Sequence, residues 1–164
     1  MAKTAAELLA DRDKILDEYE HNIGLGPLIT EGNSAELDTY MAIDRKTIEA
    51  MSGDEAAAVA FRLAQFAFHI QRSQNREDAR IKWADNQLKL SIADELNNYK
   101  GYGYVEKSSQ AIKHNSHASK FNEIIIYATQ RSVRLNFIST GLKNMADHMK
   151  SIQFNKTRNH TNDE

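Results

Sequence analysis

The feature that most constrains the fold is an uninterrupted helical pattern between Val59 and Tyr99. Apolar residues recur there at intervals of three and four, which places them on one face of an α-helix, and neither proline nor glycine interrupts them. At a rise of about 1.5 Å per residue, the stretch predicts a helix roughly 60 Å long, too long for one compact core. Such a helix needs a partner helix along most of its course, from the same chain or from another copy. The residues of the pattern are Leu63, Phe66, Ala67, Ile70, Ile81, Ala84, Leu88, Ile92, Leu96 and Tyr99.

A second helical pattern begins after Glu106 and reaches Ile152. The connecting segment, Lys100-Gly-Tyr-Gly103, contains two glycines that allow the backbone to reverse. Two long apolar-striped helices joined by a short connection predict an antiparallel hairpin. The β-branched run 124–126 has the composition of a strand, but no second strand-like segment is present to pair with it, so we expect helix there. The residues of this pattern are Ala111, Ala118, Phe121, Ile125, Ala128, Leu135, Ile138, Leu142, Met145, Met149 and Ile152.

Two shorter helices are expected before the hairpin. Thr4-Ala-Ala-Glu7 is a capping box that opens a helix ending near Glu20. Asn33 or Ser34 caps a second helix that ends near Met51, and Ser52-Gly-Asp-Glu55 is another capping box, which opens the long helix. The expected buried residues are Leu8, Leu9, Ile15, Leu16 and Tyr19 in the first helix and Leu37, Met41, Ile48 and Met51 in the second.

The composition agrees with these patterns. One proline and seven glycines in 164 residues favour an all-α protein. We predict a long antiparallel helical hairpin of coiled-coil type with a small N-terminal helical pair. Its divisions are an acidic N-terminal helical region at 1–58, the hairpin at 59–153 and a flexible tail at 154–164.

The composition also excludes several classes of site. The chain has no cysteine, which excludes disulfides, thiolate zinc sites and thiol nucleophiles. No apolar run approaches the roughly 18 residues of a membrane span, and the N-terminus lacks the apolar core of a signal peptide. We expect a cytoplasmic protein without a membrane partner.

Motifs of the common enzyme classes are absent. The chain contains no GxxxxGK[ST], GxGxxG, GxSxG or HExxH pattern. His114 and His117, three residues apart, would share a helix face and so begin a metal site, but no Glu-x-x-His pair accompanies them. We expect no enzyme, no cofactor and no metal site, and a metal–carboxylate bundle enzyme is the catalytic alternative.

Charge is divided unevenly along the chain. Residues 1–58 hold 13 acids and 5 bases, a net charge of −8, whereas residues 59–164 hold 10 acids and 16 bases, a net charge of +6. This asymmetry permits a polyanion partner for the basic part, or contacts between the acidic region and a neighbouring subunit. Arg131 and Arg134, which have no acid close by in the sequence, are candidates for the second kind of contact.

Three arginines spaced by four residues form a ridge on the predicted long helix. They are Arg72, Arg76 and Arg80, and Lys82 and Lys89 extend the charge. Guanidinium groups repeated along a helix suit the phosphates of a nucleic acid. The opposing interpretation is a solvated helix face, since each lysine follows an aspartate by four residues and Arg80 follows a glutamate by three. The arginine triplet has fewer such partners than the lysines.

The reversal between the two long patterns offers a second candidate surface. Tyr99, Tyr102 and Tyr104 alternate there with Lys100 and Lys107. Bases stack on aromatic rings and phosphates contact ammonium groups, so this mixture suits single-stranded DNA. Alternatively, the tyrosines pack over the end of the hairpin with their hydroxyls in water. The candidate nucleic-acid-binding residues are therefore Arg72, Arg76, Arg80, Lys82, Lys89, Lys100, Tyr102, Tyr104, Lys107 and Lys113.

The same segment carries a resemblance to a known family. The run Leu96-Asn-Asn-Tyr-Lys-Gly101 ends the first pattern in a Leu-x-x-Tyr-x-Gly turn, and Glu106-Lys107 opens the second. Over residues 59–153 this arrangement resembles the UvsY-type recombination mediators of bacteriophages. The resemblance implies a homo-oligomeric ring that binds single-stranded DNA and helps load a RecA-like recombinase onto strands coated by single-strand-binding protein. It also implies the host-cell cytoplasm as the location.

The sequence departs from that family just before the turn. Members often carry there a Lys-x-Arg pair implicated in DNA contact, whereas this chain has Ala93-Asp-Glu95. Either the DNA-binding charges lie on the arginine triplet and at the turn, or the resemblance concerns architecture alone. In the second case the chain is a structural or scaffolding helical oligomer, from a virion or its assembly, that does not bind DNA.

Overall fold

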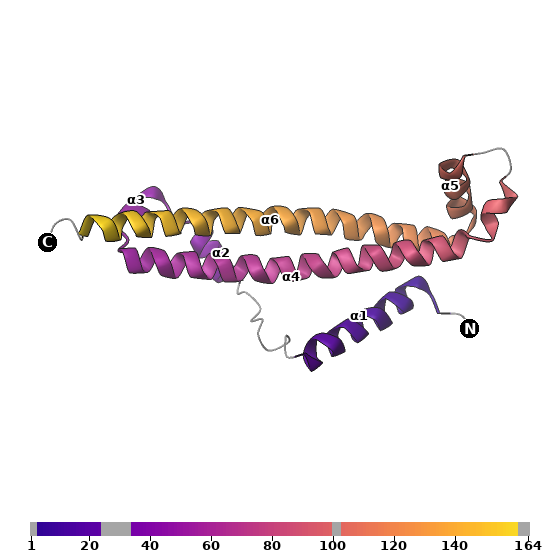
Figure 1. Ribbon diagram of the computed structural model, residues 1–164, viewed down its shortest axis with the longest axis horizontal. Helices are drawn as coiled ribbons and strands as arrows, with labels where there is room; N and C mark the ends of the chain where they lie inside the picture. The colour runs from indigo at the N-terminus through magenta and orange to yellow at the C-terminus, as the bar shows by residue number, and fades with distance from the viewer. Residues whose placement is uncertain (1–2, 24–33, 100–102, 161–164) are drawn as a thin grey trace. The chain divides into compact units, whose positions relative to one another are not determined.

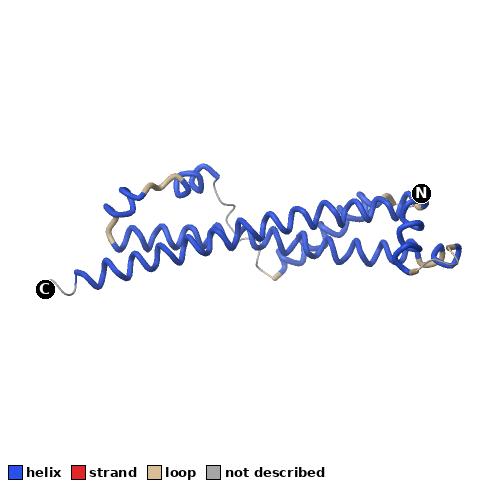
Figure 2. Tube along the Cα trace, turned by 90° about the horizontal axis from the view of Figure 1, so that it is seen from above, coloured by secondary structure: helices blue, strands red, loops and turns tan. Residues whose placement is uncertain are grey.

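The computed structural model describes residues 3–23, 34–99 and 103–160, and all regular secondary structure within these ranges is helical. Figure 2 shows the helices in blue and no strand in the described chain. The elements are α1 (Ala5–Asn22), α2 (Ser34–Met41), α3 (Arg45–Ala50), α4 (Gly53–Ile92), the 3₁₀ helix η1 (Glu95–Asn98), α5 (Tyr104–His114) and α6 (Ser116–His160). The all-α prediction is confirmed, and the run 124–126 lies within α6.

The two long helices form the predicted antiparallel hairpin. Helix α4 packs against α6, and the colour runs towards opposite ends along the two helices in Figure 1. The chain divides into two compact units, and both long helices pass from one to the other, α4 after Ser73 and α6 after Val133. The first unit contains α1, the C-terminal part of α4, η1, α5 and the start of α6, and the second contains α2, α3 and the remaining parts of the hairpin.

The core of the second unit lies along the α4–α6 seam. Leu63 and Phe66 of α4 pack with Leu142 and Met149 of α6. Small residues separate these larger side chains and allow the helices to approach closely; they are Ala56, Ala60, Ala67 and Ala146. Half-buried apolar residues of the segment that contains α2 and α3, including Leu37 of α2, pack against this core.

The core of the first unit joins α4 with α1, α5 and α6. Leu88 and Ile92 of α4 pack with Phe121 of α6, whose side chain is almost completely buried. The Trp83 ring meets the Phe121 ring edge to face, with 5.6 Å between their centroids. Ala5 of α1 completes this cluster, so α1 belongs to the first unit through apolar contact as well as charge.

Asn115 interrupts the helix that was predicted to run without a break after Glu106. Its Oδ1 accepts hydrogen bonds from the backbone N–H groups of His117 and Ala118, both at 3.0 Å, and so caps α6. Its Nδ2 donates to the carbonyl of Ser91 at 3.2 Å and to Oε1 of Glu95 at 2.8 Å. The predicted shared helix face of His114 and His117 is therefore wrong, because the two residues belong to different helices.

Two further helix ends depart from the prediction. The helix expected from Ser34 to Met51 is divided into α2 and α3, since Asp44 caps α3 by accepting a hydrogen bond from the Thr47 N–H at 2.8 Å. Helix α4 ends at Ile92 rather than Tyr99, and the chain continues into η1, a segment with two asparagines of low helix propensity. Tyr99 follows η1 and stacks on His114, with 6.3 Å between ring centroids.

Two expectations about the chain ends also need correction. Ile15 and Tyr19 of α1 were expected to be buried but are 65% and 60% exposed, because α1 packs against α4 through another side. The residues from Phe154 onward, expected to form a tail, continue α6 as far as His160.

Both predicted capping boxes are present. The Glu7 carboxylate accepts from the Thr4 N–H at 2.7 Å, and that of Glu55 from the Ser52 N–H at 2.7 Å. These backbone hydrogen bonds favour the charged form and hold the pKa of both carboxyl groups below its ordinary value. They define the starts of α1 and α4.

We expect Leu63→Ala to lower the free energy of unfolding by about 2–5 kcal/mol, because Leu63 is 1% exposed in the core of the second unit. Urea denaturation followed by circular dichroism measures the change. Leu90→Ala is the matched control, since Leu90 lies on the same helix but is 72% exposed, and its effect should stay within about 0.5 kcal/mol. Equal losses in the two variants would contradict the assignment of the core.

Candidate nucleic-acid interface

Arg76 and Arg80 face α1, whose carboxylates bind both of them. Arg80 makes a two-pronged contact with Asp13, with Nε donating to Oδ1 at 3.2 Å and Nη2 to Oδ2 at 2.6 Å. Arg76 donates through Nη2 to Oδ1 of Asp17. In the sequence the arginines have fewer acidic partners than the lysines, but α1 supplies a carboxylate to each of this pair, and Arg80 also binds Glu77 of α4. We call the pair Arg76 and Arg80 the arginine ridge.

A buried carboxylate connects the arginine ridge to α6. Glu77 is only 6% exposed and accepts hydrogen bonds from Nη1 of Arg80 at 2.5 Å and Nη2 of Arg131 at 2.9 Å. The hydrogen bond to Asp13, together with the charges of both acids, raises the pKa of Arg80 above its ordinary value. Arg131, which was a candidate for contact with a neighbouring subunit, instead pairs within its own chain.

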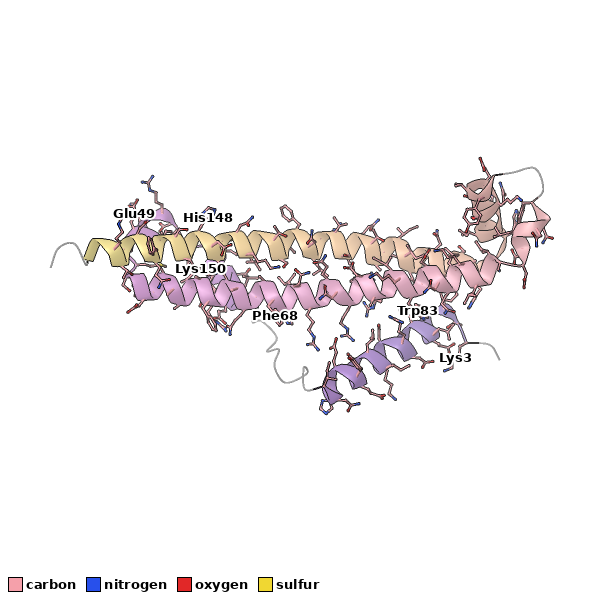
Figure 3. The ribbon with its side chains drawn as sticks, in the orientation of Figure 1. Lys3, Glu49, Phe68, Trp83, His148 and Lys150 are labelled. Atoms are coloured by element: carbon pink, nitrogen blue, oxygen red, sulfur yellow. The ribbon has the colours of Figure 1, made fainter. Side chains whose placement is uncertain are left out.

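Helix α1 also contacts α4 at Trp83. The Arg12 guanidinium carbon lies 5.9 Å from the centre of the Trp83 ring, within the range of a cation–π interaction. A groove of about 270 Å³ separates the two helices at this point; its lining residues include Leu8, Leu16 and Gln87. Figure 3 labels Trp83 on α4 where α1 approaches it. The chain has a single tryptophan, so this contact has its own spectroscopic reporter.

Lys82 and Lys89 do not extend the arginine ridge as predicted. With 3.6 residues per turn, Lys89 lies two and a half turns after Arg80 and therefore on the opposite side of α4. Lys82 lies two residues after Arg80 and seven before Lys89, so it shares the side of Lys89. The candidate residues of α4 thus form two separate groups.

Lys89 lies near the start of α5, and Lys82 lies about two turns before Lys89 on the same side of α4. Lys89 donates to Asp85 at 2.6 Å, which raises the pKa of Lys89, and the nearby Tyr104 contributes to the same shift. The Tyr104 side chain is 64% exposed, and Lys107 follows it by one turn of α5. Among the described residues Lys82 and Lys107 have no carboxylate partner. We call Lys82, Lys89, Tyr104 and Lys107 the lysine–tyrosine surface.

The remaining candidates lie elsewhere. Lys113 is exposed but stands nine residues after Tyr104, on the opposite side of α5. Arg72 is half-buried in the part of α4 that belongs to the second unit. Lys100 and Tyr102 lie outside the described residues.

Two further features would bear on function, a cluster of metal ligands and a membrane-spanning helix. Within residues 3–23, 34–99 and 103–160, no three His, Asp or Glu side chains come together as metal ligands would. Nor do the described helices include one with both the length and the apolar composition needed to cross a bilayer.

Sequence reasoning found the arginine ridge but missed the acids that bind it. Asp13 and Asp17 are four residues apart on α1, the same spacing that separates Arg76 from Arg80 on α4. This matched spacing was the available signal. A weaker signal was the position of Glu77, which is an acid in a stretch that the apolar pattern predicts to face a partner helix.

Compared with known proteins, the chain matches no protein-family model, no curated protein and no solved structure.

We expect Glu77→Ala to cost on the order of 3 kcal/mol of unfolding free energy, because it leaves two arginines without a buried partner. This value is at the low end of the range for breaking a buried ion pair, since Arg80 keeps its contact with Asp13 and Arg131 is half-exposed. Chemical denaturation measures it. In the control Glu123→Ala, which removes an exposed partner of Lys120, the cost should be below about 1 kcal/mol. A Glu77 variant as stable as this control would show that the network contributes nothing.

Proposed function

We propose that the protein is a single-stranded DNA-binding recombination mediator, which self-assembles and helps load a RecA-like recombinase onto strands coated by single-strand-binding protein. The observation that carries the DNA-binding part is the lysine–tyrosine surface. It combines three lysines of α4 and α5 with an exposed aromatic ring at the start of α5, and only Lys89 has a carboxylate partner among the described residues.

This surface has the chemistry that non-specific strand binding needs. Ammonium groups contact phosphates irrespective of sequence, and a tyrosine ring stacks on any base. Each phosphate contact releases counterions, so the affinity should fall steeply with salt. No bond is made or broken in this function, because the protein acts by holding a strand in place.

Exposed apolar side chains support the self-assembly part. Phe61 and Phe68 of α4 are each 63% exposed, and Phe137 of α6 is 80% exposed. Phe68 lies on the side of α4 that faces away from α6 (Figure 3). Large aromatic side chains that remain in water are favourable sites for contact with another helical surface. Several copies in one assembly would also multiply the phosphate contacts along a strand.

The recombinase and the single-strand-binding protein enter this proposal through the resemblance at the turn after α4. The Leu-x-x-Tyr-x-Gly pattern, which lies in the sequence between the long helices α4 and α6, resembles that of the UvsY-type mediators. The Ala93-Asp-Glu95 departure is compatible with DNA contact at Lys82 and Lys107, which flank this segment in the sequence.

A structural or scaffolding role is the second candidate. The occupied arginine ridge favours it, since Arg76 and Arg80 are already bound by carboxylates of the same chain. Both candidates share the hairpin and the expected assembly. Retention of single-stranded DNA distinguishes them.

We expect the double substitution K82E/K107E to weaken binding to an oligo-dT strand and to reduce the slope of log affinity against log salt by about 1.4, or 0.7 for each lost phosphate contact. Fluorescence anisotropy of labelled oligo-dT at several salt concentrations measures both quantities.

The control for this pair is K46E/K150E, which makes the same change of charge on exposed helix positions outside the lysine–tyrosine surface. It should retain most of the affinity. Binding of oligo-dT by the wild type independently of salt would favour the structural role, as would a failure to retain it in both the wild type and a D13N/D17N variant.

We expect the wild-type protein to have a solution mass of at least twice 18.6 kDa and Phe137→Asp to lower it, because a charged group replaces an exposed aromatic at the proposed contact between copies. Sedimentation measures the mass, and circular dichroism should show unchanged helix content. The control is Asn136→Asp, which places a carboxylate at the neighbouring exposed position. A monomeric wild type would refute self-assembly.

A further inference from the structure

We infer that α1 inhibits DNA binding by the arginine ridge of its own chain. Helix α1 covers Arg76 and Arg80 and keeps them from phosphates until a bound strand displaces it. The inference rests on the proposed function, since it assigns to the DNA-binding site a form of self-inhibition. The candidate residues then form two groups on opposite sides of α4, the open lysine–tyrosine surface and the covered arginine ridge, which becomes available only when α1 leaves.

The acids of α1 have the same spacing as the arginines of the ridge. Asp13 and Asp17 lie one helical turn apart, as do Arg76 and Arg80, and the order is reversed: the earlier acid binds the later arginine. Two antiparallel helices with this spacing bring both pairs into contact together. A row of carboxylates at regular intervals presents to the arginines what a row of phosphates would present.

The contact at Arg76 leaves hydrogen-bonding capacity unused. Arg76 binds Asp17 through Nη2, while its buried Nε has no hydrogen-bond partner. A buried donor without an acceptor costs free energy. A phosphate, which offers several oxygens, can accept from Nε and Nη2 together in the two-pronged geometry that guanidinium favours.

Several features make α1 displaceable. Asp17 is 60% exposed in its ion pair, so water and salt weaken the attraction. Ile15 and Tyr19 are more than half exposed, and the residues of α1 that join the apolar core are Ala5 and Leu8 at its start. Arg80, in contrast, also binds Glu77 and therefore keeps its orientation when Asp13 leaves.

The test compares D13N/D17N with E18Q/D38N in the full-length chain. Both doubles remove two negative charges, but the control acids are exposed and make no contact with the arginine ridge. We expect D13N/D17N to bind oligo-dT about 5- to 150-fold more tightly than the wild type, the usual range of coupling between sites, and the control to differ little. Adding Arg76→Gln to D13N/D17N should remove most of the gain.

Emission from Trp83 provides an independent readout of α1 itself, because Arg12 of α1 lies over its ring. D13N/D17N should shift the emission to the red without DNA, and saturating oligo-dT should shift the wild type in the same direction. Circular dichroism should show that both doubles remain folded.

The outcomes separate the inference from the proposed function. If the wild type binds oligo-dT but D13N/D17N binds no more tightly, or if Trp83 emission is unaltered when DNA binds, α1 is not an inhibitor, although the DNA-binding role stands. If neither the wild type nor D13N/D17N binds oligo-dT, the DNA-binding role fails and the inhibition with it. If only D13N/D17N binds, the inference is supported.

Discussion

The pairing of α4 with α6 is the constraint on which the rest of the molecule depends. Each helix is far too long to be stable in water without tertiary contacts along its length, and each buries apolar side chains against the other. The short helices then attach to this pair wherever an apolar or charged position on α4 remains open. Helix α2 attaches through Leu37 in the second unit, and α1 attaches beside Trp83 in the first.

Apolar stripes alone do not fix which residue of α4 lies opposite which residue of α6, because one turn of sliding preserves most contacts. Polar side chains in the seam supply this information. Glu77 binds Arg131 in the first unit, and in the second the buried Ser139 hydroxyl donates to the carbonyl of Ala67 at 3.2 Å. A register shift would leave these groups buried without partners, which costs more than the contacts contribute when they are made.

The parts of the fold that could be predicted were those set by short-range or strongly periodic patterns. The capping boxes and the two long helices are of this kind, since neighbouring residues determine them. The break at Asn115 could not be predicted, because its side chain caps α6 while also binding Ser91 and Glu95, which the fold brings near. The same reason applies to the arginine ridge: Asp13 stands 67 residues before Arg80, and only the folded chain joins them.

The alanines of the seam have a consequence for how this protein can vary. Ala56, Ala60 and Ala67 are at most 1% exposed, so the spacing of the helix axes is set by side chains that end at Cβ. Any larger side chain at these positions would have to push the two helices apart or distort them. Divergence in the seam should therefore proceed by paired exchanges, in which growth on one helix accompanies shrinkage on the other, while the outer faces change freely.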